Sequence, residues 1–183
     1  PPRNRAAHIR ILTQAEYFVS KEKVSNLLSN TKKGLTLEHI FPKKSENWKE
    51  DSNYSGNEMN QLRLLLQHIG NHTMVSDDFN SILGNKKFRE KQYGALENET
   101  QKAEKECYNN SGLQITKALA NPTIGKWEPD TLLKRGEVLL RIWAMNSADR
   151  VAKKVRPVNQ NEDYLIKPIE DATMRDLYSL ING

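Results

Sequence analysis

The stretch Leu35-Thr36-Leu37-Glu38-His39-Ile40-Phe41, which stops at Pro42, decides the fold. Its apolar and polar residues alternate as they do in a short, half-buried strand. The downstream segment Gly70-Asn71-His72-Thr73-Met74-Val75 predicts a turn and a second short strand. Ser76 or Asp77 fits the N-cap of a following helix. This order predicts two strands and then a helix that brings Asn80 back beside Glu38.

Apolar residues at helical spacing flank this unit on both sides. Ile11, Ala15 and Phe18 predict one or two amphipathic helices up to about Asn30, and further helices are expected over 59–69 and 130–146. We expect Asp130 to cap the last of these. Trp127 and Trp143 are expected in the core, and residues 43–57 in a loop. The predicted fold class is α+β, mainly helical with an embedded ββα unit.

Composition narrows the possible functions of the 183-residue chain. Its formal net charge is +5, with basic residues concentrated in 1–35 and 130–156 and acidic ones in the centre and the tail. This distribution suits a protein that binds a polyanion and also holds a cation. The single cysteine, Cys107, excludes an internal disulfide and a cysteine-based zinc cluster. No apolar run approaches the ~20 residues that cross a bilayer, so no membrane partner is expected.

The residues around the first strand carry a recognisable chemistry. Hydrolysis of a phosphodiester needs an activated water and a cation that offsets charge on the phosphate and the leaving oxygen. A neutral histidine such as His39 supplies a base near pH 7. The carboxylate of Glu38 and the amide of Asn80 offer the oxygen ligands that suit Mg²⁺ or a similar ion such as Mn²⁺. Further on, Asn85-Lys86-Lys87-Phe88-Arg89-Glu90-Lys91 is strongly basic.

These segments, in this order, resemble the HNH (ββα-metal) nuclease domain at the C-terminus of GmrSD-like, modification-dependent (type IV) restriction enzymes. Trp127, Arg135 and Trp143 fill the late positions of the pattern, so the resemblance covers about residues 36–146. It implies a metal-dependent DNA endonuclease that defends bacteria against phage or other modified, foreign DNA in the cytoplasm. It also implies an N-terminal nucleotide-hydrolysing or modification-sensing domain, absent from this chain, which we interpret as a fragment.

The resemblance implies a role for each matching residue. His39 is the general base, and Glu38 and Asn80 are the protein ligands of one divalent metal. Asn71 ties the loop that orients His39 and does no chemistry itself. A basic helix edge that begins after Asn80 is expected to meet DNA phosphates, through Lys86, Lys87, Arg89 and Lys91. We divide the chain into an N-terminal helical segment (1–35), the nuclease domain (36–156) and an acidic tail (157–183).

Two alternatives stay open. One is a catalytically silent DNA-binding or protein-interaction module that keeps the fold without cleaving. The other is a zinc-stabilised domain that uses His68 and His72, which stand four residues apart. His72 stands where the family usually has leucine, which makes the second strand more polar than expected. His8 has no evident partner in the sequence.

Overall fold

The computed structural model describes residues 5–21, 34–49, 53–94 and 106–155. The acidic tail 157–183 and the end of the predicted N-terminal helices lie outside these residues. Within the described ranges the protein is mainly helical, with one small sheet, so the α+β fold class is confirmed.

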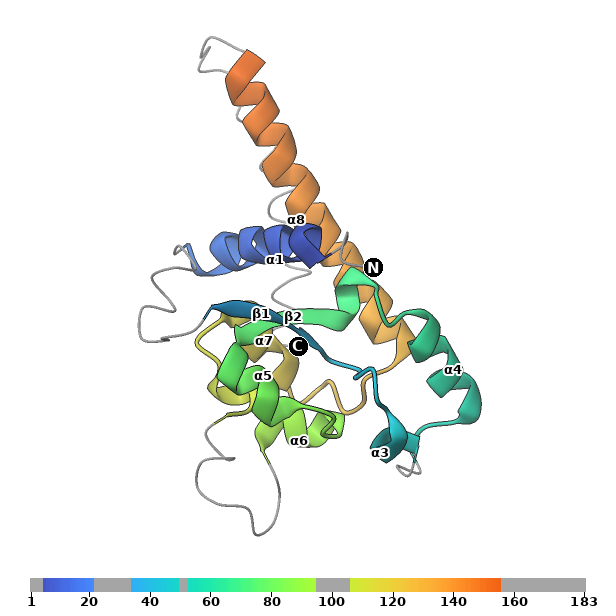
Figure 1. Cartoon of the computed structure of the whole chain (residues 1–183). Coiled ribbons are helices and arrows are strands. Elements are labelled where there is room, and N and C mark those ends of the chain that lie inside the picture. The colour runs from blue at the N-terminus through green and yellow to red at the C-terminus, as the bar shows by residue number, and fades with distance from the viewer. Residues whose placement is uncertain (1–4, 22–33, 50–52, 95–105, 156–183) are drawn as a thin grey trace.

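The sheet consists of two antiparallel strands, β1 (Leu35–His39) and β2 (His72–Ser76). Their register places His39 directly opposite His72. Helix α1 (Arg5–Ser20) covers one face of the sheet, and α5 (Asp77–Leu83) and α7 (Gln114–Lys117) cover the other (Figure 1). Because β2 has helices on both faces, its first four residues are all buried. Among the residues that the structure describes, β1 pairs with a strand along one edge only, and its other edge stays open to other contacts.

Local capping explains why the helices begin where they do. The Ser76 hydroxyl accepts a hydrogen bond from the amide of Phe79 and starts α5, as the sequence predicts. Ser55 and Glu58 form a capping box at the start of α4 (Gly56–Leu64). Helix α5 ends at Gly84, whose φ of +44° lies in the left-handed region that glycine tolerates. The short elements are α3 (Glu46–Lys49), η2 (Ile69–Asn71), α6 (Phe88–Tyr93), η3 (Tyr108–Asn110) and η4 (Ala118–Ala120).

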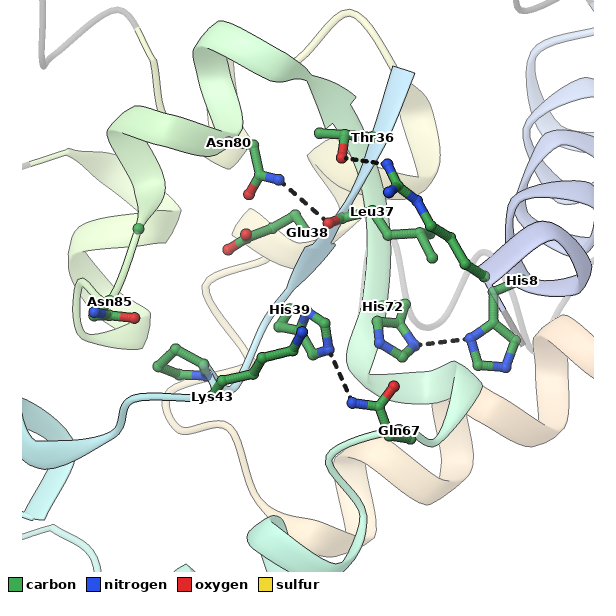
Figure 2. Close-up of a pocket in the computed structure, with 13 residues that line it drawn as sticks. His8, Thr36, Leu37, Glu38, His39, Lys43, Gln67, His72, Asn80 and Asn85 are labelled. Carbon is green, nitrogen blue, oxygen red and sulfur yellow. Dashed lines mark hydrogen bonds between the residues drawn. The ribbon is translucent and has the colours of Figure 1, made fainter. Parts of the chain in front are cut away.

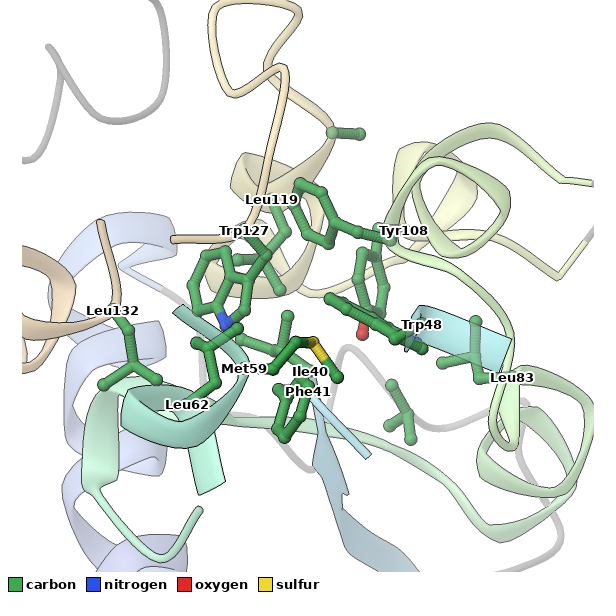
Figure 3. Packing of buried hydrophobic residues seen from close by; sticks show 13 residues of the cluster. Ile40, Phe41, Trp48, Met59, Leu62, Leu83, Tyr108, Leu119, Trp127 and Leu132 are labelled. Atoms are coloured by element: carbon green, nitrogen blue, oxygen red, sulfur yellow. The ribbon is translucent and has the colours of Figure 1, made fainter. Parts of the chain in front are cut away.

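Two apolar clusters hold these elements together. The larger one lies beneath the end of β1 and gathers aromatic and aliphatic side chains from α3, α4, α6 and the loops around them, as Figure 3 shows. Its largest wholly buried members are Trp48 and Trp127. The second cluster joins α1 and the strand pair to α8 (Pro129–Val155) through Leu12, Met74 and Ile142, among others.

Helix α8 starts one residue earlier than predicted, so Asp130 lies in its first turn rather than at the cap. The prediction that Trp127 belongs to the core is confirmed, but the one for Trp143 is wrong. Trp143 is 39% exposed, because the buried stripe of α8 passes through its neighbour Ile142 and successive helix residues point about 100° apart.

A close approach between η2 and α8 fixes the turn that leads into β2. A Cβ on Gly70 would collide with the carbonyl oxygen of Leu132, and one on Gly136 would collide with the ring of His68. Buried Arg135 strengthens the same junction, since its Nη1 donates to the carbonyls of Gly70 (2.8 Å) and His72 (2.7 Å). The start of β2 is therefore anchored on α8. Among the described helices, none is long and apolar enough to cross a membrane.

Candidate active site

A cleft of about 650 Å³ opens along the free edge of β1 (Figure 2). An edge exposes side chains from both faces of a strand, which explains why consecutive residues of β1 line the same cleft. Helix α5 supplies Asn80 on one side, and α1 supplies Arg5 and His8 on the other. The remaining lining residues are Thr36, Leu37, Glu38, His39, Pro42, Lys43, Gln67, His72, Gly84 and Asn85.

His39 lies at the end of β1 with its ring packed against the ring of His72. The two ring centroids are 4.4 Å apart and the rings meet edge to face, at 77°. The side-chain amide of Gln67 lies 3.4 Å from His39 Nε2. Burial, followed by the positive charges of Lys43 and Lys91, lowers the pKa of His39 to about 4. The ring is therefore neutral at pH 7 and able to accept a proton.

Glu38 is buried and paired with Lys91. The ammonium of Lys91 donates to Glu38 Oε1 (2.5 Å) and to the carbonyls of His39 (2.9 Å) and Ile40 (3.2 Å). Burial raises the pKa of the Glu38 carboxyl, and the Lys91 charge opposes that shift. The hydroxyl of Tyr108 also points at Oε1, at 3.4 Å. Lys91 thus holds both the Glu38 carboxylate and the end of β1 in place.

The prediction that Lys91 contacts DNA is wrong. Its side chain is 0% exposed, and its ammonium donates to three oxygen atoms inside the protein. The sequence could not show this, because a lysine at the end of a basic run looks the same whether it points out or in. Lys91 is instead the counter-ion of the carboxylate that the sequence singles out.

Asn80 lies beside Glu38 at the open edge of β1. Its amide nitrogen donates to the carbonyl of Leu37 (3.2 Å), and its amide oxygen is turned toward the carboxylate side of the cleft (Figure 2). Two oxygen-bearing side chains are thus brought together, and the amide nitrogen is held away from them. This donor set fits a hard cation such as Mg²⁺, which takes few protein oxygens and keeps several waters.

Asn71 is wholly buried and does not line the cleft. Its side-chain oxygen accepts from the amide of Phe41 (2.8 Å) and from the indole of Trp127 (3.3 Å). Its side-chain nitrogen donates to the carbonyls of Phe41 (3.0 Å) and Leu66 (3.1 Å). These contacts are those expected of a residue that fixes the chain directly after His39.

The basic helix edge expected after Asn80 does not exist as one helix. Helix α5 ends at Leu83 and α6 begins at Phe88, so Lys86 and Lys87 lie in the connection between them. Arg89 is exposed and stacks on the ring of Tyr93, 4.7 Å from its centroid. The basic residues of 86–91 do not line the cleft. DNA contact by Lys86, Lys87 and Arg89 stays a prediction.

The two histidines of the zinc alternative lie in different surroundings. His72 faces the cleft and approaches His8, with the two Nδ1 atoms 3.0 Å apart. His68 accepts a hydrogen bond from the amide of Gly70 and borders another hollow, against α8. Within the part of the chain that the structure describes, no group of three or more His, Cys, Asp or Glu side chains could hold a metal ion.

Sequence reasoning did not single out Arg5, His8, Lys43 or Gln67, which also line the cleft. His8 does have a partner, contrary to expectation, because α1 returns to the strand pair from more than sixty residues away in sequence. No motif around Arg5, His8 or Gln67 in the sequence indicates that these residues line the cleft. Lys43 follows the histidine strand by four residues, and that proximity was the one available signal.

Comparison with known proteins identifies the family. No curated protein and no solved structure matches the chain. The sequence model of the C-terminal domain of GmrSD restriction endonucleases matches residues 2–142, which is more than half of the chain and includes α1 as well as the strand pair. The chain therefore belongs to the family of GmrSD restriction endonuclease C-terminal domains.

Proposed function

We propose that the protein is a metal-dependent DNA endonuclease of the HNH (ββα-metal) type, and that the edge of β1 is its active site. One observation carries the proposal: Glu38, His39 and Asn80, from β1 and α5, line the same cleft. The family supports a nuclease with DNA as its substrate. The succession β1, β2, α5 supports the ββα assignment.

Each residue has a part in phosphodiester hydrolysis. His39, neutral at pH 7, accepts a proton from the attacking water. The negative phosphate of a bound strand raises the pKa of His39 from about 4 and makes it a stronger base. Glu38 and Asn80 would hold a divalent cation, Mg²⁺ or Mn²⁺, which when bound offsets the charge on the phosphate and the leaving oxygen. Lys91 and Asn71 keep the strand and the loop after it in position.

The biological setting is part of the proposal, and the family supports it only as far as a role in restriction. We place the domain in the bacterial cytoplasm as the effector of a defence protein that cuts phage or other modified, foreign DNA. An N-terminal domain that hydrolyses nucleotide or senses the modification would direct it.

The direct test is cleavage of supercoiled plasmid in Mg²⁺, with EDTA as the control. His39→Ala should lower the nicking rate by about 10²- to 10⁴-fold, the usual contribution of a general base. His68→Ala is the matched control, because it removes a histidine that does not line the cleft. Equal rates for His39→Ala and the unmutated protein would exclude His39 as the base. DNA binding without Mg²⁺-dependent cleavage would favour the silent module.

Asn80 gives the cleaner test of the metal site, because Glu38→Ala would also leave buried Lys91 without its counter-ion. Asn80→Ala loses one neutral hydrogen bond, to Leu37. We expect the Mg²⁺ concentration for half-maximal cleavage to rise, with much of the rate restored at high Mg²⁺. An unchanged Mg²⁺ dependence would remove Asn80 from the ligand set.

A further inference from the structure

The charged side chains around the cleft are unevenly distributed. Within the described lining, the charged residues are Arg5, Glu38 and Lys43. Glu38 is buried and matched by Lys91, whereas Arg5 and Lys43 are both exposed. The charge that the cleft presents to solvent is therefore positive, and it comes from two residues far apart in the sequence.

Arg5 stands at one end of the cleft and is already oriented. One of its guanidinium nitrogens, Nη2, donates to the hydroxyl of Thr36 at 3.1 Å. Thr36 precedes Glu38 by two residues of β1, which is about 7 Å along a strand. A guanidinium carries five N–H donors in a planar fork, and the contact with Thr36 uses only one of them. The remaining fork suits the paired oxygens of a phosphate.

Lys43 stands at the other end, just after β1 has finished. It is close enough to His39 that its charge is the second cause, after burial, of the lowered pKa of that ring. Figure 2 shows the Lys43 side chain beside His39, on the side of the ring away from Thr36, the residue that Arg5 contacts. The two cations therefore bracket the strand residues that carry the proposed chemistry.

We infer that Arg5 and Lys43 form a phosphate clamp for one DNA strand, with contacts on either side of the phosphate that is cut at Glu38, His39 and Asn80. This inference rests on the proposed function and assigns the DNA path to α1 and the residue pair Pro42–Lys43. In this arrangement α1 forms one wall of the active site. The contacts are with the backbone, so they add affinity without sequence preference.

Each cation has a matched control. Arg10 is exposed on the same helix as Arg5, and Lys44 is exposed directly after Lys43, but neither lines the cleft. Binding of a short DNA duplex is measured in EDTA, so that no cleavage occurs, over a series of salt concentrations. The slope of log affinity against log salt should fall by about 0.9 for Arg5→Ala and by about 0.9 for Lys43→Ala. Arg10→Ala and Lys44→Ala should leave the slope close to that of the unmutated protein.

A conservative variant of Arg5 tests whether the paired donors of its guanidinium contribute to DNA binding. Arg5→Lys keeps the charge but loses the paired donors, so it should keep most of the salt slope and still bind more weakly than the unmutated protein. Equal slopes for the cleft variants and their controls would overturn the clamp, while Mg²⁺-dependent nicking would still uphold the nuclease. An unmutated protein that neither binds nor cuts DNA would overturn both.

Discussion

Two polar pairs of different character hold the strand pair, one on each strand. On the side of α6, the ammonium of Lys91 meets the carboxylate of Glu38 at 2.5 Å. On the side of α1, His8 and His72 meet at 3.0 Å, and burial lowers the pKa of both, so that they are neutral at pH 7. Strand β1 is thus held by a charged pair, and β2 by a neutral pair.

These two pairs show that the neighbours of a residue in the sequence do not predict its role in the structure. Lys91 belongs to a dense basic run and is nevertheless a core residue. His8 has no chemical neighbours in sequence and nevertheless touches the cleft. Charge density along the chain is therefore a poor guide to which residues line the cleft, and the contacts made with the two strands are a better one.

Breaking the charged pair should have the largest effect. Lys91→Met leaves Glu38 as an uncompensated buried carboxylate, and such changes cost about 3–5 kcal/mol of unfolding free energy. Urea unfolding at pH 7 measures this loss. Lys87→Met, outside the cleft and partly exposed, is the matched control and should change stability by less than about 0.5 kcal/mol.

The pH dependence sharpens this test. Without Lys91 the folded pKa of Glu38 rises further above its unfolded value, since only burial remains as a major influence. In the Lys91→Met variant the folded protein favours the protonated Glu38 carboxyl, so its stability is highest at low pH and falls as pH rises. The deficit of Lys91→Met should therefore grow between pH 5 and pH 8, and Glu38→Gln in the same chain should recover much of it. A deficit independent of pH would mean that lost packing, not charge, is the cause.

The sequence predicts the central unit well because its signals are local. Alternation marks β1, Ser76 caps α5, and Gly70 with Asn71 marks the turn before β2. These features depend on neighbours within a few residues, which a linear pattern contains. The placement of Glu38, His39 and Asn80 around one cleft follows from the order of these elements, although Asn80 lies more than forty residues from Glu38 in the sequence.

The residues at the cleft that the sequence misplaces or misses involve contacts between distant parts of the chain. Gly84 adopts a positive φ and separates α5 from α6, so Lys91 turns inward instead of extending a basic helix edge. Helix α1 packs back on the strands, which brings Arg5 and His8 to a site more than thirty residues further along the chain. Such contacts depend on tertiary packing, and no periodicity in one sequence encodes them.

Breaking the neutral pair of His8 and His72 should have a smaller effect on stability, and only at acidic pH. Burial, followed by the nearby charges, lowers the pKa of His72 from an unperturbed 6.5 to about 3. Between these two pH values the unfolded chain is protonated at His72 and the folded protein is not. Stability is therefore full above pH 6.5 and falls as pH decreases toward 3. The groups that act on the ring are His39, His8, Arg135 and Lys43.

His72→Leu removes this penalty, because leucine carries no titratable group. Between pH 6 and pH 4 its stability should fall less steeply than that of the unmutated protein, by up to about 1.4 kcal/mol per pH unit, the value for one proton. Thermal or urea unfolding across this range measures the slope. Identical slopes for the two proteins would show that His72 does not titrate with unfolding.

The remainder of the basic run should give the smallest effect, and it divides into two parts. Lys87 follows Gly84 and Asn85, which line the cleft, and we expect it to meet a phosphate beyond the clamp. Arg89 lies further on, in α6, and its guanidinium is stacked on Tyr93. We expect Lys87→Ala to lower the salt slope of DNA binding by about 0.9 and Arg89→Ala to lower it by less, with stability altered by less than about 0.5 kcal/mol in both. Equal slopes for both variants and the unmutated protein would make the run a solvated surface, and the DNA path would then depend on the cations of the cleft alone.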